Sequence, residues 1–135
     1  MREVALDSSV ILKWFTAFEE EHQDRARAFQ AAFADGRLRV IAPRLLMLEL
    51  LNAAARGWRW SAEQLAELAE DLAELRFELV DPPLVDVARW AARGLSAYDA
   101  AFVAVAEAAG VELVTADRQI VQLAPAVARP LAEAA

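Results

Sequence analysis

The residues of this chain best suited to chemistry are four acids that border apolar segments: Asp7, Glu49, Asp99 and Asp117. The first ends a short apolar run, the second interrupts a leucine-rich one, the third opens a run and the fourth follows one. Burying a carboxylate without a partner costs several kcal/mol, so each acid needs something to neutralise it. Few basic residues are near them in the sequence, and a divalent cation is the natural partner. The set therefore predicts a metal site.

The chemistry that such a site supports is phosphodiester cleavage. Mg²⁺ and Mn²⁺ prefer carboxylate oxygens and also bind substrate phosphates. Two such ions ~3.5–4 Å apart can activate water and stabilise the leaving oxygen. The net charge of −7 argues against broad affinity for nucleic acids. It does not exclude a nuclease whose cations screen a local acidic pocket.

Three of the four acids also have a structural explanation at a helix start. Asp7 and Asp117 could each cap the helix that follows. The segment Ser96-Ala97-Tyr98-Asp99 matches a capping box, in which serine and aspartate exchange hydrogen bonds with the backbone. A capping role does not exclude metal binding, because a helix start already favours a carboxylate.

Glu49 is harder to explain by structure alone, because its segment has no polar face between Leu45 and Leu51. Asn52 lies three residues further, on the same side of the expected helix, so the two could form a satisfied core pair or share a functional pocket. Thr115 is either an ordinary residue at a strand end or one that orients Asp117 or a water at the metal.

Length and composition predict a single domain, 1–135. The chain has 135 residues, 58% of them hydrophobic, which is ample for one core. The absence of cysteine excludes disulfides, thiol catalysis and thiolate metal sites. There is no long apolar run and no signal-peptide core, so we expect a cytoplasmic protein without a membrane span. The single histidine, His22, lies in a charged segment typical of a solvated helix start.

Hydrophobic patterns predict strands that alternate with helices. Strands are expected at Glu3–Leu6, Arg39–Ala42, Glu78–Val80, Val111–Thr115 and around Val127. Helices are expected at Ser8–Trp14, Glu19–Ala34, Arg44–Arg56, Ser61–Leu75, Leu84–Arg93, Tyr98–Ala109 and Arg118–Leu123. Strands separated by helices pair in parallel, and ligands bind beyond their carboxyl ends. The pattern predicts an α/β fold with Asp7 and Asp117 at one sheet edge, and an alanine-rich tail that frays.

Four sequence blocks in this order resemble the PIN-domain ribonucleases, and most closely the VapC-type toxins of toxin–antitoxin pairs. The blocks are Leu6-Asp7-Ser8-Ser9-Val10 with Lys13-Trp14-Phe15 after it, Ala42–Asn52, Leu95–Ala100 and Leu113–Asp117. Each block alone is unspecific, but four in this order at this length are quite specific. The resemblance covers nearly the whole chain.

The resemblance implies a three-layer α/β/α PIN-like domain with a central, mostly parallel sheet, and Mg²⁺- or Mn²⁺-dependent cleavage of RNA. It places the family's catalytic and metal-binding acids on Asp7, Glu49, Asp99 and Asp117. It places two hydroxyl positions on Ser9 and Thr115, and a polar position on Asn52. It also implies a homodimer that is inhibited by a small cognate antitoxin whose tail covers the site.

One departure from the family pattern follows the fourth acid. In some members another acid comes shortly after it, whereas Arg118 and Gln119 follow Asp117 here. This leaves open whether one or two metals bind. It also motivates the alternative of a degenerate PIN module that binds RNA or protein without cutting. A phosphatase with Asp7 as nucleophile ranks last, because that chemistry wants a second acid where Ser9 stands.

Three further features leave alternatives open. Lys13, the only lysine, lies about one helical turn beyond Ser9 and could reach a scissile phosphate or be a solvated surface residue. The segment Arg56–Trp60 mixes cations with aromatic rings, which could stack bases, anchor a partner or close a helical hairpin. Four apolar residues could line a groove for an antitoxin helix or lie in the core: Leu12, Trp14, Phe15 and Phe18.

Overall fold

The computed structural model describes residues 1–16 and 20–134, and in them it has five strands in one parallel sheet. The sheet order is β3-β2-β1-β4-β5. The strands are β1 (Arg2–Leu6), β2 (Leu38–Pro43), β3 (Glu78–Val80), β4 (Leu113–Thr115) and β5 (Ala128–Pro130). All four neighbouring pairs are parallel, which confirms the predicted α/β class.

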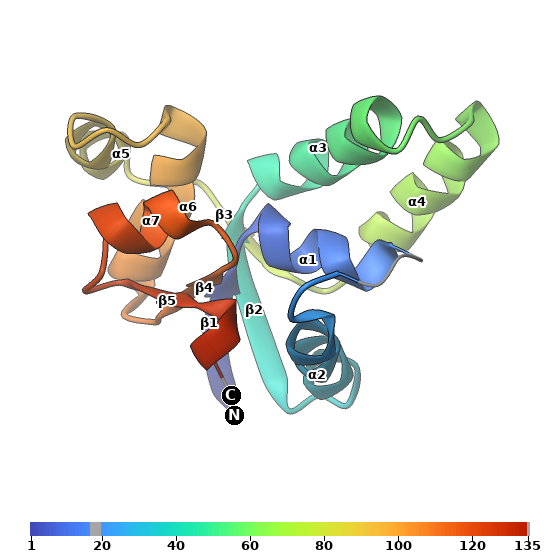
Figure 1. Ribbon diagram of the computed structural model, residues 1–135, viewed down its shortest axis with the longest axis horizontal. Coiled ribbons are helices and arrows are strands. Elements are labelled where there is room, and N and C mark those ends of the chain that lie inside the picture. Colours follow the sequence, from blue (N-terminus) through green and yellow to red (C-terminus); the bar gives the residue numbers. More distant parts are fainter. Residues whose placement is uncertain (17–19, 135) are drawn as a thin grey trace.

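Seven α-helices in the described part of the chain cover both faces of the sheet. They are α1 (Ser8–Phe15), α2 (Gln23–Ala34), α3 (Leu45–Asn52), α4 (Ala62–Glu74), α5 (Leu84–Ala91), α6 (Ala97–Ala109) and α7 (Arg118–Leu123). In Figure 1, α1 to α4 lie on one side of the sheet and α5 to α7 on the other. This confirms the three-layer α/β/α arrangement. Right-handed crossovers explain it, because the chain moves one way from β1 to β3 and the other way from β3 to β5.

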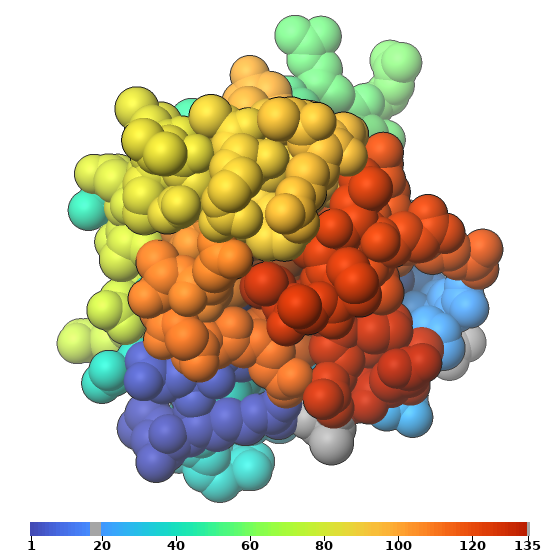
Figure 2. Space-filling model, turned by 90° about the vertical axis from the view of Figure 1, so that its left-hand side faces the viewer, coloured from blue at the N-terminus to red at the C-terminus, as the bar shows by residue number. Residues whose placement is uncertain are grey.

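The core is densest around α6, which lies against β1 and β2 under the cover of α5. Seven consecutive residues of α6, Ala100–Ala106, are buried, so this helix is apolar all round. Figure 2 looks onto this face and shows α5, α6 and α7 next to one another. The central strands β1 and β4 are buried at their carboxyl ends, which places whatever follows them beside the core.

The ends of several elements differ from the expectation. The helix expected over Glu19–Ala34 begins at Gln23, after a turn in which His22 has a φ of 60° and is half-buried; Glu19 lies outside the described residues. The helix expected over Arg44–Arg56 is α-helical to Asn52 and continues as a π-helix, η1 (Ala53–Gly57). Within the described residues, none of the helices has the length and apolarity to cross a membrane.

The C-terminal segment is packed against the rest of the protein as far as Ala134, so the expectation that the alanine-rich tail frays was wrong. A 3₁₀ helix, η2 (Leu131–Glu133), follows β5, and both Leu131 and Ala134 are buried. The Arg25 guanidinium donates a hydrogen bond of 2.7 Å to the carbonyl oxygen of Ala134. The segment is therefore held against α2.

Two of the four tryptophans, Trp14 and Trp90, lie in the interior. Trp14 is 4% exposed, and its ring centroid lies 5.9 Å from those of Phe33 and Phe77. Trp14 is thus a core residue, not part of a groove for a partner; Phe18 lies outside the described residues. Trp58 and Trp60 are half-buried with ring centroids 5.1 Å apart, which favours closure of the α3–α4 hairpin.

We predict that Phe102→Ala, in the middle of α6, lowers the free energy of unfolding by about 3–5 kcal/mol. Phe102 is 1% exposed, so truncation leaves a cavity under the central strands. Urea denaturation measures the change. The control is Tyr98→Ala on the same helix, whose side chain is 66% exposed and whose loss should cost ~0.5 kcal/mol or less. Equal losses for both variants would contradict this account of the core.

Candidate active site

The predicted acids gather where the strand order reverses. β1 pairs with β4 in register, with Leu6 opposite Val114. The chain leaves β1 toward β2 and leaves β4 toward β5, so the loops after these strands diverge. Such a switch point is where open α/β sheets bind ligands. Asp7 directly follows β1, and Asp117 lies two residues beyond the end of β4.

Two hydroxyl groups bind the carboxylate of Asp7. Ser9 Oγ donates to Oδ1 at 2.5 Å and Thr115 Oγ1 donates to Oδ2 at 2.5 Å. The Val10 N–H of α1 acts to lower the pKa of Asp7, but its contact with this carboxylate falls short of a capping hydrogen bond, and the two hydroxyl groups are the main partners of Asp7. The structure therefore brings Ser9 and Thr115, the two hydroxyl positions that the resemblance implied, to this acid.

The orientation of both hydroxyls is fixed from the other side by the backbone after β4. Ser9 Oγ accepts a hydrogen bond of 2.9 Å from the Ala116 N–H, and Thr115 Oγ1 accepts one of 3.0 Å from the Asp117 N–H. A hydroxyl has one proton to give. Because each oxygen accepts from an amide, its proton is available to Asp7. Thr115 thus orients Asp7 and at the same time holds the backbone of Asp117.

Burial dominates the electrostatics of Asp7, which is 4% exposed. It raises the pKa of this carboxyl from 3.8 to about 6, although the hydroxyls of Ser9 and Thr115 act to lower it. The nearby Asp99 carboxylate raises the pKa further. Asp7 is therefore a carboxylate whose charge the protein only partly compensates.

Glu49 reaches the same place from α3, and its charge is even less compensated than that of Asp7. Its Oε1 atom is buried and has no hydrogen-bond partner within the described residues. Burial raises the pKa of Glu49 from 4.5 to about 7; the Ser8 hydroxyl lowers it, and the carboxylates of Asp99 and Asp7 raise it. Ser8 is a site residue that the sequence analysis missed, although it lies between Asp7 and Ser9.

Asn52 does not join this group. It is the last residue of α3 and is exposed, and within the described part of the chain no hydrogen bond links it to Glu49. The alternative of a satisfied core pair between these two residues is therefore wrong. The helix that carries Glu49 brings its carboxylate to the acids and leaves Asn52 on the surface.

Asp99 and Asp117 combine a place at a helix start with a place at the site. Ser96 Oγ accepts a hydrogen bond of 3.0 Å from the Asp99 N–H, so the serine caps α6. Burial raises the pKa of Asp99, and so does the neighbouring Asp117 carboxylate. Asp117 Oδ1 accepts from the N–H groups of Gln119 and Ile120, at 2.8 and 3.4 Å, so the capping alternative is right for Asp117.

The four acids form one electrostatic group that fits a divalent cation. Asp99 lies close enough to Asp7, Glu49 and Asp117 to interact electrostatically with each. Within residues 1–16 and 20–134, no salt bridge involves any of the four acids. Their donors are all oxygens, and one of them, Glu49 Oε1, is buried and unpartnered. Among the described residues no three acidic or histidine side chains form a ready-made cage. Mg²⁺ does not need one, because it keeps several waters and takes one or two carboxylates.

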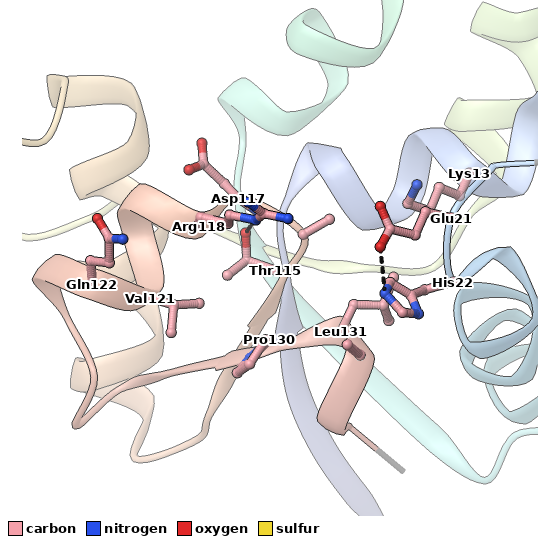
Figure 3. A pocket seen from close by; sticks show the side chains of 12 residues that line it. Lys13, Glu21, His22, Thr115, Asp117, Arg118, Val121, Gln122, Pro130 and Leu131 are labelled. Atoms are coloured by element: carbon pink, nitrogen blue, oxygen red, sulfur yellow. Dashed lines mark hydrogen bonds and ion pairs between the residues drawn. The ribbon is translucent and has the colours of Figure 1, made fainter.

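A cavity of about 560 Å³ adjoins the acids. Its lining includes Asp117, which is one of the four, and Thr115, which binds Asp7. Lys13 lies on its wall (Figure 3), with a side chain that is only 12% exposed and an ion pair of 3.4 Å to Glu20. The alternative of a solvated surface lysine is therefore wrong. Lys13 is placed at the edge of the site.

Comparison with known proteins gives a family match and several structures of similar fold. A family model described as "PIN domain" matches residues 4–125. Among solved structures, the chain is similar to PAE2754 from Pyrobaculum aerophilum, with 25% identity and a TM-score of 0.66 over 97% of this chain and 90% of the other. It is similar to FitAcB from Neisseria gonorrhoeae, with 15% identity and a TM-score of 0.70 over 97% of this chain and 99% of the other.

A third structure, FitAB bound to an IR36 DNA fragment, matches at 15% identity and a TM-score of 0.67 over 98% of this chain and 97% of the other. The two matches at 15% identity establish a shared fold. No curated protein sequence matches the chain.

We predict that Glu49→Gln removes part of the pH dependence of stability in metal-free protein. The unfolded chain releases the Glu49 proton near pH 4.5, whereas the folded protein keeps it to about pH 7. Stability is therefore lost as the pH rises through this window. The glutamine variant should be more stable than wild type at about pH 8, and the gap should close toward about pH 4.

Urea denaturation in the presence of a chelator measures this difference at both pH values. The control is Glu67→Gln, an exposed glutamate on α4, which should follow the wild-type profile. A Glu49→Gln profile that parallels wild type across the window would contradict the burial of an uncompensated carboxylate.

Proposed function

This chain belongs to the PIN domain family, and from that premise we propose that it is a metal-dependent endoribonuclease, the toxin of a toxin–antitoxin pair. One observation carries the proposal. Four carboxylates from four separate elements lie together at the switch point of the sheet, and within the described ranges none of them has a basic partner. A fold that needed these acids only for capping would not have to bring them together.

In this proposal Asp7, Glu49, Asp99 and Asp117 together hold Mg²⁺ or Mn²⁺, some of them through the waters that the ion keeps. A bound divalent cation of this kind polarises a phosphodiester and lowers the pKa of water. Ser9 and Thr115 keep Asp7 in one orientation and donate their protons to it, which favours its ionised form. Glu49 has a pKa of about 7 in the metal-free protein, so it exchanges a proton near neutral pH.

Two residues are assigned to the RNA rather than to the metal. Lys13 lines the cavity that Asp117 also lines, and it supplies a cation for a phosphate of the substrate. Asn52 is exposed at the end of α3, where its amide can hydrogen-bond to RNA. Neither assignment requires a contact with the carboxylates.

The proposed partners are a small cognate antitoxin and a second copy of this chain. The structural neighbour FitAB is described as bound to a DNA fragment. A chain with a net charge of −7 is by itself a poor ligand for DNA. An assembly of that kind built on this chain would therefore need a basic, DNA-binding partner, which is the character expected of an antitoxin.

We predict that metal-stripped wild-type protein binds Mn²⁺ and that Asp99→Asn abolishes this binding. The substitution removes the acid that interacts with the other three. Isothermal titration calorimetry measures the binding. The matched control is Asp24→Asn, an exposed acid in the first turn of α2, which should bind like wild type. Equal binding by the wild-type, Asp99→Asn and Asp24→Asn proteins would contradict the assignment of the acids as metal ligands. No binding by any of the three would favour a degenerate PIN module that does not cut RNA.

We also predict that Asp99→Asn abolishes RNA cleavage, while Thr115→Val lowers it about 10- to 100-fold. Valine keeps the volume of threonine but cannot donate to Asp7, so it affects orientation rather than the ligand itself. Cleavage of a pool of RNAs of varied sequence is the measurement, with circular dichroism to verify the fold. Cleavage retained by Asp99→Asn at the wild-type rate would refute the assignment.

A further inference from the structure

Apart from Lys13, the wall of the cavity beside the acids has no role in substrate binding as proposed above. The cavity is lined by distant parts of the chain (Figure 3): Lys13, Glu21 and His22 from one, and residues 115–118, Val121, Gln122 and residues 130–132 from the other. Of the four acids only Asp117 lines it, and Figure 3 shows this carboxylate pointing away from Pro130 and Leu131. The cavity is thus a separate space that opens next to the site.

One part of the cavity wall is apolar. Val121 and Pro130 are half-buried, so both keep surface that a ligand can contact, whereas Leu131 lines the cavity but is only 1% exposed. Binding pockets combine such apolar surfaces with a few placed polar groups. A flat ring, such as a nucleobase, is a ligand that this surface can take.

The polar part of the wall has one cation without a charge partner. Lys13 pairs with Glu20 at 3.4 Å, and His22 lies 3.2 Å from Glu21. Arg118 is exposed and forms no ion pair among the residues the structure describes. A guanidinium presents a planar set of donors that suits a phosphate. Gln122, on the same helix, offers both a donor and an acceptor to the edge of a base.

We propose that this cavity binds one unpaired nucleotide of the RNA strand, with its base against Val121 and Pro130, close to Leu131, and its phosphate at Arg118. The volume of about 560 Å³ is in the range of small-ligand sites. Thr115 and Asp117 belong to the cavity and to the acid group alike, so this nucleotide is next to the phosphate that is cut. The inference rests on the proposed function for its place in the reaction, whereas nucleotide binding itself can be measured without cleavage.

The test is binding of the four nucleoside 5′-monophosphates to the full, metal-free chain, followed by NMR of its methyl groups. At least one nucleotide should shift the methyl resonances of Val121 and Leu131 in a saturable way, and inorganic phosphate alone should not. Arg118→Gln should weaken this binding roughly tenfold, because it removes a charge-assisted hydrogen bond. The matched control is Arg37→Gln at the opposite end of the sheet, where Arg37 pairs with Asp35 at 3.0 Å.

Two results would overturn the inference: no shift of either methyl group at saturating nucleotide, or equal binding by the Arg118→Gln and Arg37→Gln proteins. A basic peptide that shifts these methyl groups when nucleotides do not would mean that a partner protein occupies the cavity, and would also overturn it. Both readouts are independent of catalysis. A protein that binds nucleotides here but cuts no RNA would therefore refute the nuclease proposal and leave the cavity assignment standing.

Cleavage gives a second readout if the protein is active. Val121→Phe fills the cavity and should change the nucleotide preference next to the cut, while Mn²⁺ binding stays as in wild type. An active protein whose preference and KM are unchanged by both Val121→Phe and Arg118→Gln would overturn the cavity assignment and leave the nuclease function intact.

Discussion

Two hydroxyl groups hold the Asp7 carboxylate at the point where β1 and β4 diverge, and the rest of the site depends on this contact. Each hydroxyl also accepts a backbone N–H from the segment after β4. The acid is therefore tied both to its own helix and to a strand that follows 108 residues later. Since the same threonine supports the backbone of Asp117, the positions of the first and fourth acids are fixed together.

This arrangement costs stability, because like charges gather beside a core. Burial and mutual repulsion raise the pKa values of Asp7 and Glu49 into the range of neutral pH. The interior of α6, buried over seven consecutive residues, supplies apolar packing that offsets the cost. Glu49 and, to a smaller extent, Asp7 therefore hold protons near neutral pH when no cation is present, and a cation that binds there displaces them.

How far the sequence predicts the structure depends on how local the signal is. Strand β3 and helix α7 have the predicted bounds, because a proline turn follows the first and the Asp117 cap begins the second. The position of Asp7 and Asp117 at one edge of the sheet follows from parallel strand ends alone. The burial of Lys13, the contact of Ser8 with Glu49 and the cavity depend on side-chain packing between distant segments, which no local pattern encodes.

The residue after Asp117, Arg118, connects the group of four acids with the cavity beside it. A further acid there would add a ligand to the metal group, whereas Arg118 adds a cation on the side of the cavity. Asp117 already uses one carboxylate oxygen to cap α7, and Arg118 follows it as the first residue of that helix, exposed at the cavity. On this account the segment after β4 has two roles. Asp117 acts at the reacting phosphate, and Arg118 and Gln122 bind the neighbouring nucleotide. The departure from the family pattern is then a difference in how substrate is held, and it does not imply that cleavage is lost.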